Sequence, residues 1–179
     1  MRKKARAGRV KMILMDVDGT LTDGTLAVLP DGEEIKSYNV KDGMGVLLAQ
    51  LAGLRIGIIT GKTSKGLEKR AERLKIAEIH QGIIDKKKTL NEILDKNQLK
   101  PEEVAYIGDD LGDLEVIKAV GFAAAVADAH PLIKKSAHYV CKNSGGRGAF
   151  RELIEYIIGA QKKWEVITSG FKRIFDRKI

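Results

Sequence analysis

The segment MILMDVDGT, residues 12–20, decides the fold. An unbroken apolar run is typical of a strand buried on both faces of a parallel sheet. The run ends in Asp16, a second carboxylate follows at Asp18, and Gly19 allows the chain to turn away. Ligands of open parallel sheets bind beyond the carboxyl ends of the strands. We therefore expect a central strand that delivers both carboxylates to a functional crevice.

Outward from this segment, short apolar runs alternate with amphipathic helical patterns. Further strands are expected over residues 55–60, 79–81, 104–108 and 122–126. Helices are expected from near Asp42, over 64–74 with Ser64 as N-cap, over 86–97 and 111–120, and from 149 to 159 and onward. This alternation predicts an α/β fold, a doubly wound (Rossmann-like) parallel sheet with helices on both faces.

One segment interrupts the alternation directly after the first strand. Residues 25–29 and 33–38 have strand character around the turn sequence Pro30-Asp31-Gly32. We interpret residues 24–40 as an inserted β-hairpin flap, too small to be a domain. Its apolar side chains, Leu26, Val28 and Ile35, need a partner to cover them, which favours contacts in an oligomer.

Composition limits the class of protein. A chain of 179 residues with 44% hydrophobic and 31% charged residues fits one globular domain, which we place at residues 12–160. One cysteine excludes a disulfide framework, and three scattered histidines argue against a histidine metal site. No apolar run reaches the roughly 18 residues of a membrane span, and no signal-peptide pattern is present. We expect a cytoplasmic protein without a membrane partner.

The net charge of +8 is located in the two ends of the chain. Residues 1–11 and 161–179 hold twelve basic and two acidic side chains, whereas residues 12–160 hold 20 basic and 22 acidic ones. We expect basic, solvated tails, of which the C-terminal one could reach an anionic substrate through Lys172, Arg173 and Arg177. A net acidic body with few aromatic residues excludes a nucleic-acid-binding surface.

Polar groups recur at the ends of the other predicted strands. Thr60 ends one of them, and Asp109 and Asp110 follow another, with Asp113 close behind. Carboxylates that share a crevice repel one another unless a cation lies among them, and all-oxygen ligation favours Mg²⁺. A carboxylate can attack phosphorus, a second can transfer protons, and a lysine and a hydroxyl can neutralise the phosphoryl oxygens. These residue types together predict phosphoryl transfer.

The motifs DVDGT, IITG, DK and GDDLGD, in this order, resemble the haloacid dehalogenase superfamily. The longer segments DVDGTLTDG, YNVKDGMG, QGIIDKK, YIGDDLGDLEVIKAVG, AVADAHP and GGRGAFRE resemble the 3-deoxy-D-manno-octulosonate 8-phosphate phosphatase family, from about residue 12 to 159. This resemblance implies an enzyme without a cap domain that uses Mg²⁺ and an aspartyl-phosphate intermediate in lipopolysaccharide precursor synthesis. It also implies a homotetramer whose flaps meet centrally.

The resemblance implies roles for individual residues. Asp16 would be the nucleophile and a Mg²⁺ ligand, and Asp18 the general acid and base, with its backbone carbonyl on the metal. The other implied roles are phosphoryl binding by Thr60 and Lys86, metal ligation by Asp109, and support of the metal site by Asp110 and Asp113. Without the resemblance, Asp110 and Asp113 also fit a helix N-terminus, where the dipole favours carboxylates.

Substrate recognition is expected at two cations. A keto-sugar acid phosphate carries a carboxylate, and the resemblance points to Lys62 and Arg70 as its partners. Family members usually carry arginine at the first position; lysine keeps the charge but lacks the planar fork. The alternatives are a capless phosphatase for another sugar-acid phosphate and a non-catalytic oligomerisation module. A phospho-accepting receiver domain is excluded, because receivers do not show DxDGT after the first strand.

Overall fold

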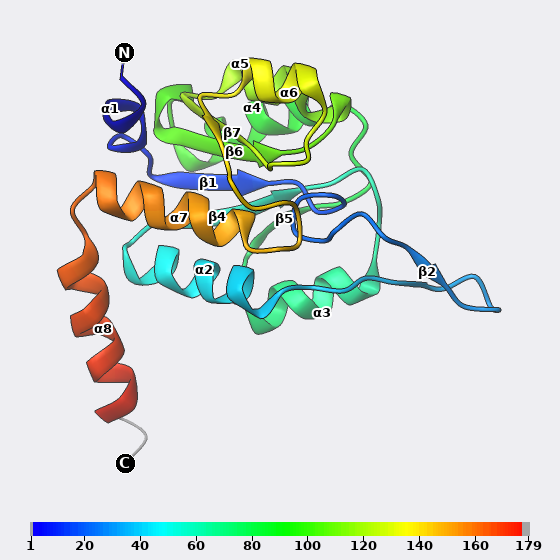
Figure 1. Cartoon of the computed structure of the whole chain (residues 1–179), viewed down its shortest axis with the longest axis horizontal. Helices are drawn as coiled ribbons and strands as arrows, with labels where there is room; N and C mark the ends of the chain where they lie inside the picture. Colours follow the sequence, from blue (N-terminus) through cyan, green and yellow to red (C-terminus); the bar gives the residue numbers. More distant parts are fainter. Residues whose placement is uncertain (1, 177–179) are drawn as a thin grey trace.

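The computed structural model describes residues 2–176, with side chains described up to Phe171. Its main sheet has six parallel strands in the order β5-β4-β1-β6-β7-β8 (Figure 1). Their bounds are β1 Met12–Met15, β4 Arg55–Ile59, β5 Glu78–His80, β6 Val104–Gly108, β7 Phe122–Ala125 and β8 Tyr139–Val140. The strand order reverses direction at β1, so the predicted doubly wound fold is confirmed, and the reversal creates a crevice beyond the end of β1.

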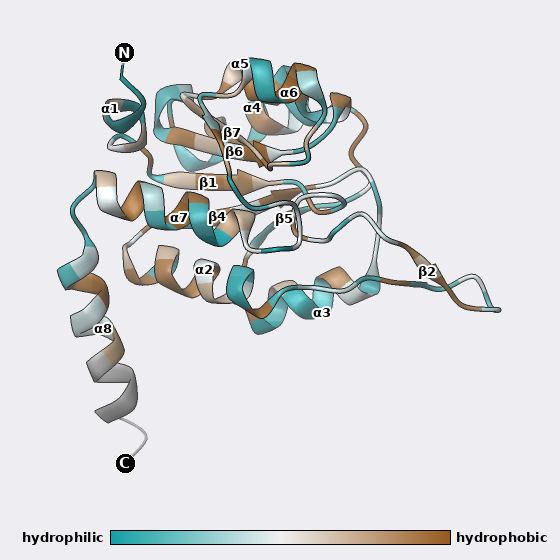
Figure 2. Cartoon of the chain, viewed as in Figure 1, coloured by the Kyte–Doolittle hydropathy of each residue, from teal (hydrophilic) through white to brown (hydrophobic). Residues whose placement is uncertain are grey.

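Helices cover both faces of this sheet (Figure 1). One face carries α2 Val40–Leu51, α3 Lys65–Arg73 and α7 Ala149–Ala160, and the other carries α4 Lys86–Asn97, α5 Leu114–Ala119 and α6 Pro131–Ser136. Polar side chains begin several of them: Asn39 accepts from the Lys41 amide, Ser64 from Leu67 and Asp85 from Lys88. The hydrophobic strands lie inside and the polar helix faces lie outside (Figure 2).

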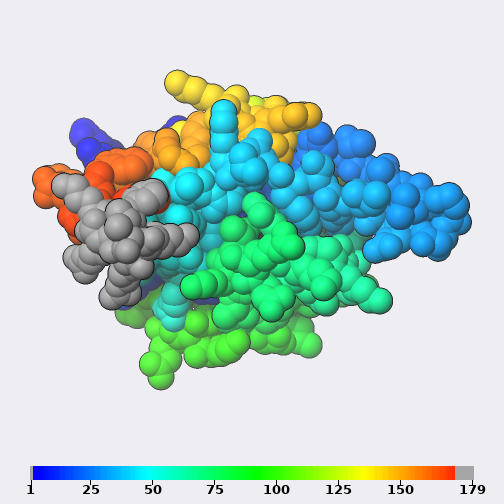
Figure 3. All heavy atoms as spheres, turned by 90° about the horizontal axis from the view of Figure 1, so that it is seen from below, coloured from blue at the N-terminus to red at the C-terminus, as the bar shows by residue number. Residues whose placement is uncertain are grey.

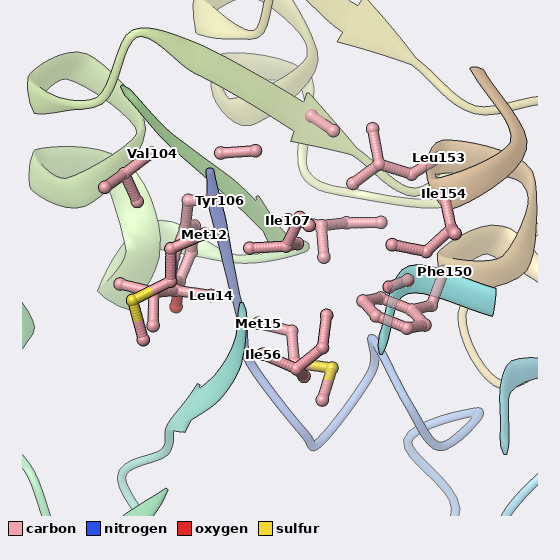
Figure 4. Packing of buried hydrophobic residues seen from close by; sticks show 14 of the residues in the cluster. Met12, Leu14, Met15, Ile56, Val104, Tyr106, Ile107, Phe150, Leu153 and Ile154 are labelled. Atoms are coloured by element: carbon pink, nitrogen blue, oxygen red, sulfur yellow. The ribbon is translucent and has the colours of Figure 1, made fainter. Parts of the chain in front are cut away.

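The core forms because β1 is apolar on both sides. Met12 and Leu14 face one layer of helices, together with Tyr106, whereas Met15 faces Phe150 on α7 (Figure 4). All five side chains are at most 1% exposed. Alternating side chains of a central strand therefore hold the two helix layers to one sheet.

The inserted hairpin is confirmed. Strands β2 Ala27–Val28 and β3 Glu34–Ile35 pair antiparallel, and the turn is closed by the Leu29 amide on the Glu33 carbonyl at 2.8 Å. The hairpin extends well beyond the rest of the molecule (Figures 1 and 3). Its apolar side chains are unpartnered in the single chain: Val28 is 64% exposed and Ile35 51%.

Some element bounds differ from the prediction. The expected helix over residues 111–120 begins with a 3₁₀ turn at Leu111–Asp113. The short helix α6, the two-residue strand β8 and a 3₁₀ turn at Pro101–Glu103 were not predicted. These elements are too short to show a hydrophobic period, so only packing on the sheet edge defines them.

The expectation of solvated tails differs from the structure. Residues Lys3–Ala7 form helix α1, in which Ala7 is fully buried and the Arg6 guanidinium donates to the Gly121 carbonyl at 3.0 Å. Residues Trp164–Asp176 form helix α8, which packs on the body through Ile167, 1% exposed. A count of charges misses such packing because a few apolar contacts anchor an otherwise basic segment. The side chains of Lys172, Arg173 and Arg177 lie outside the described residues.

No helix within residues 2–176 is long and apolar enough to cross a membrane.

Candidate active site

The strand register brings the predicted polar groups to one edge of the sheet. Met15 of β1 lies opposite Ile58 of β4 and Ile107 of β6, so these three strands end at one level. Asp16 follows β1, Thr60 follows β4 and Asp109 follows β6. The Asp16 amide continues the ladder by donating to the Ile107 carbonyl at 3.1 Å. Residues up to 93 positions apart therefore meet because parallel strands end together.

Lys86 is the centre of the site. It begins helix α4, and its ammonium lies 2.5 Å from Asp16 Oδ1 and 2.7 Å from Asp113 Oδ1. The Tyr106 hydroxyl, fully buried in β6, donates to the same Asp113 oxygen at 2.6 Å. Burial by itself lowers the pKa of Lys86, but the charges of Asp16 and Asp113 outweigh it and the pKa is raised. Lys86 therefore stays cationic between two carboxylates.

Asp109 forms the other side of the acidic cluster. Its Oδ1 accepts from the Thr20 hydroxyl at 3.0 Å, and its amide donates to Asp113 Oδ2 at 3.0 Å. Gly19, at φ +85°, lies so close that a Cβ there would be 2.1 Å from Asp109 Oδ2. A glycine is thus needed for the loop after β1 to approach Asp109. Asp110 is exposed instead, and its carboxylate accepts from the Leu111 amide at 2.7 Å.

The residues present fit a divalent cation. Asp16, Asp109 and Asp113 each offer a carboxylate oxygen, and these oxygens lie within 4.8 Å of one another. Burial and the charge of Asp113 raise the pKa of Asp16 to about 6, although Lys86 opposes this shift. Burial and the charges of Asp16 and Asp113 raise the pKa of Asp109 to about 7. In both cases burial, and then the neighbouring carboxylates, disfavour the ionised form, and a metal ion at this site would favour it.

Lys36 is a site residue that the sequence analysis missed. Its ammonium, on the hairpin just after β3, lies 2.6 Å from Asp18 Oδ1 and 2.7 Å from Oδ2. With it, the carboxyl groups of Asp16, Asp18, Asp109 and Asp113 lie close to two ammonium groups, those of Lys36 and Lys86. The available signal was alternation along β3, which places Glu34 and Lys36 on one face and Ile35 on the other.

An open cavity of about 840 Å³ lies between the hairpin and the loop after β4. Charged side chains of both signs line it, among them Glu33, Glu34, Lys36, Lys62 and Lys65. Lys62 Nζ is 3.5 Å from Glu34 Oε1, so this ammonium group forms an exposed ion pair with the hairpin. Thr60, 1% exposed, lies deeper, directly before this loop.

The structure does not bring Arg70 into that cavity. Its guanidinium lies 6.0 Å from the centre of the Tyr38 ring, in a separate small cavity with Leu21, Gly43 and Leu74. The Tyr38 pKa is raised to about 12, by burial first and then by the charge of Asp18, which Arg70 partly offsets. In a single chain, Lys62 and Arg70 therefore line different cavities.

The glycine-rich segment 145–148 packs against the loop after β1. The Gly146 amide donates to the Thr20 carbonyl at 2.9 Å, and a Cβ on Gly145 would lie 1.7 Å from the Gly19 carbonyl oxygen. The buried Asp42 carboxylate accepts from the Gly148 and Arg151 amides at 3.2 and 3.0 Å and so caps α7. This segment supports the loop that carries Asp18 and Gly19.

The fold and the acidic site define the chain as a haloacid dehalogenase-like hydrolase. The family model with that description matches residues 64–153, which include Lys86, Asp109 and Asp113. Within this class, the chain belongs to the 3-deoxy-D-manno-octulosonate 8-phosphate phosphatase family. It is 45% identical over 163 residues to the enzyme of that name from Yersinia pestis, covering 91% of this chain and 87% of the relative.

Solved structures agree with this assignment. The Yersinia pestis phosphatase has a TM-score of 0.89 at 45% identity, covering 90% of this chain and 88% of that one. The 3-deoxy-D-manno-octulosonate 8-phosphate phosphatase of Moraxella catarrhalis, solved with a magnesium ion, a phosphate ion and KDO, has a TM-score of 0.91 at 34% identity. That match covers 94% of this chain and 97% of the other.

The raised pKa values predict how metal binding depends on pH. Mg²⁺ needs the ionised carboxylates, so protons compete with it below the pKa values of about 6 for Asp16 and 7 for Asp109. Affinity for Mg²⁺ should rise as pH increases through this window. The metal-free protein should lose stability over the same rise, because its folded state binds more protons than the unfolded chain.

Isothermal titration with Mg²⁺ at about one pH unit below and above the two raised pKa values measures the change in affinity. Thermal unfolding in the presence of chelator measures the change in stability of the metal-free protein. Asp95→Asn is the control, because that exposed carboxylate on α4 lies outside the cluster, and the variant should titrate like the wild type. An affinity that does not change with pH would contradict the prediction.

Proposed function

We propose that this protein is a Mg²⁺-dependent phosphatase that hydrolyses 3-deoxy-D-manno-octulosonate 8-phosphate to 3-deoxy-D-manno-octulosonate and phosphate, in lipopolysaccharide precursor synthesis. The observation that carries the proposal is the Lys86 ammonium between the Asp16 and Asp113 carboxylates, next to Asp109, at the carboxyl edge of the sheet. Identity of 45% over nine-tenths of the chain to a phosphatase of that name supports the substrate.

In the first step, an Asp16 carboxylate oxygen forms a bond to phosphorus, and the bond between phosphorus and the ester oxygen breaks. The Asp18 carboxyl group gives its proton to that oxygen, which leaves as the sugar hydroxyl. Asp16 is suited to the attack because it is 5% exposed and held by one short ion pair to Lys86. Its orientation is thereby fixed before the substrate binds.

In the second step, a water oxygen forms a bond to phosphorus, Asp18 takes its proton, and the bond between phosphorus and Asp16 breaks. Phosphate leaves and both aspartates return to their starting forms. Lys86 and the Thr60 hydroxyl are assigned to the phosphoryl oxygens, whose charge they stabilise. A Mg²⁺ ion held by Asp16, Asp109 and the Asp18 carbonyl, with Asp113 in support, would supply charge neutralisation between the carboxylates and the phosphoryl group.

The cavity beneath the hairpin is the place assigned to the sugar acid. Lys62 lies on its wall and would bind the substrate carboxylate after leaving Glu34. Arg70 lies next to Tyr38 and outside this cavity, so in a single chain it is a weaker candidate for direct contact with the substrate carboxylate. Another sugar-acid phosphate of similar length would satisfy the same groups, so phosphate release from a panel of sugar-acid phosphates is the direct test of the substrate.

The roles of the first two aspartates predict different losses. Asp16→Asn should abolish turnover, because the amide is a poor nucleophile, while chelator should abolish it reversibly in the wild type. Asp18→Asn should slow turnover by roughly 10²–10⁴-fold, the range for general acid–base groups. Steady-state phosphate release measures both, with circular dichroism as the control for folding. Retained turnover in Asp16→Asn would rule out the covalent intermediate.

The position of Lys62 predicts a substrate-dependent effect. Lys62→Ala should raise KM for the keto-sugar acid phosphate and change it little for p-nitrophenyl phosphate, which lacks a carboxylate. Lys62→Arg should increase the preference for the octulosonate ester, because arginine can bind a carboxylate with two hydrogen bonds. Lys69→Ala, on the exposed side of α3, is the matched control. Equal KM changes for both substrates would assign Lys62 to the phosphate or to the fold.

We also assign a homotetramer to this protein, in the cytoplasm. The support is the exposed apolar surface of the hairpin, with Leu26 40%, Val28 64% and Ile35 51% exposed. Such a surface usually marks an interface, and closed symmetric assemblies are the common solution.

Light scattering on the eluting protein should give the mass of four chains. Val28→Glu should reduce that mass, whereas Leu132→Glu, on exposed α6, should not. A wild-type monomer at micromolar concentration would overturn the assembly proposal but not the assigned activity.

A further inference from the structure

Lys36 is an exception on the hairpin. All residues from Asp23 through Ser37 except Lys36 are exposed, whereas the Lys36 side chain is only 2% exposed. Its neighbour Ile35 points to solvent and is 51% exposed, as alternation along a strand requires. Burying an ammonium group is costly unless it is paired and hydrogen-bonded. One charged side chain of the hairpin is therefore buried against the body of the protein, where we expect it to have a specific partner.

That partner is the Asp18 carboxylate. The Lys36 ammonium donates a hydrogen bond to Oδ2 at 2.7 Å and lies 2.6 Å from Oδ1, which has no hydrogen-bond partner among the described residues. Lys86, the other buried ammonium, contacts Asp16 and Asp113. Among the ion pairs of the described residues, Asp18 pairs with Lys36 only. The two catalytic aspartates thus have separate cations, one from the sheet edge and one from the hairpin.

We propose that Lys36 is a positioning residue of the phosphatase, which orients the Asp18 carboxyl group for proton transfer and so makes the hairpin part of the catalytic centre. The inference rests on the proposed function. When Asp18 gives its proton to the ester oxygen, a carboxylate forms beside the Lys36 ammonium and is stabilised by it. The same contact holds the carboxylate in place to take the proton from water in the second step.

A purely structural role for the Lys36 pair fits the geometry less well. The hairpin has other ion pairs to the body, Glu34 with Lys62 at 3.5 Å and Asp23 with Arg147 at 3.0 Å, and both are solvent-exposed. A tether for the hairpin could lie at the surface as these do. Of these three pairs, only that of Lys36 has a buried side chain on the hairpin, and its partner Asp18 is the group assigned to proton transfer.

The test compares two leaving groups in the same protein samples. The sugar alkoxide needs a proton to leave, whereas p-nitrophenolate leaves without one. The constant kcat/KM covers the steps up to departure of the leaving group. Lys36→Met should therefore lower kcat/KM for the sugar-acid phosphate roughly 10- to 100-fold, the loss typical when a residue that orients a reacting group is removed. For p-nitrophenyl phosphate the change should stay within about twofold. The ratio between the substrates does not depend on the folded fraction.

A double-mutant cycle separates action through Asp18 from direct contact with the sugar. In the Asp18→Asn background, Lys36→Met should cause no further loss, and in the wild-type background Lys36→Arg should recover most of the activity. Lys41→Met, an exposed lysine at the start of α2, is the matched control and should behave as wild type.

Equal losses for both substrates, or the same loss with and without the Asp18 carboxylate, would overturn the inference while the wild type still hydrolyses the sugar-acid phosphate. A wild type without phosphatase activity would overturn the proposed function, and this inference with it.

Discussion

The structure depends on one buried ammonium group, that of Lys86, which forms ion pairs with both Asp16 and Asp113. Three charged groups share the edge of an apolar sheet, and none of them could be buried there alone without a large cost in solvation. The ammonium compensates for two carboxylates, while Asp109 and Asp18 add more negative charge beside them. The remaining charge makes the site a receptor for a divalent cation and a phosphoryl group, so the same electrostatic constraint links folding, metal binding and catalysis.

Backbone geometry makes this concentration of charge possible. The ends of β1, β4 and β6 lie at one level because the strands pair in parallel register. The loop after β1 then approaches Asp109 closely, and this approach requires glycine at positions 19 and 145, where any Cβ would collide with the neighbouring oxygen atoms. The glycine-rich segment after β8 is thus a support for the catalytic loop, and its amides bond to backbone and carboxylate oxygens of the protein itself, such as the Thr20 carbonyl and Asp128 Oδ1.

The hairpin carries both apolar and charged side chains. On β3, Ile35 lies on one face with Ala27 opposite it, while Glu34, opposite Val28, and Lys36 lie on the other face and pair with Lys62 and Asp18. A period of two residues is enough to give one short strand both surfaces. An inserted hairpin can in this way border the cavity next to the loop after β4 and still leave apolar side chains exposed at the surface.

The sequence by itself determined the fold class and placed acidic residues near the ends of strands, because an apolar run followed by DxDGT needs only local pattern to be recognised; the predicted ends of β4, β5 and β7 were each one residue too late. It also predicted α4 and β6 to the residue, since both have clear periodicity and strong boundaries. Only the tertiary structure decided that Lys36 pairs with Asp18, that Arg70 and Lys62 line different cavities, and that both basic ends contain helices that pack on the body. These three features depend on which face of a short strand or helix packs against an apolar neighbour or an opposite charge that lies far away in the sequence. Alternation along a strand can show that Lys36 and Ile35 face opposite ways, but it does not show which distant residue each one meets.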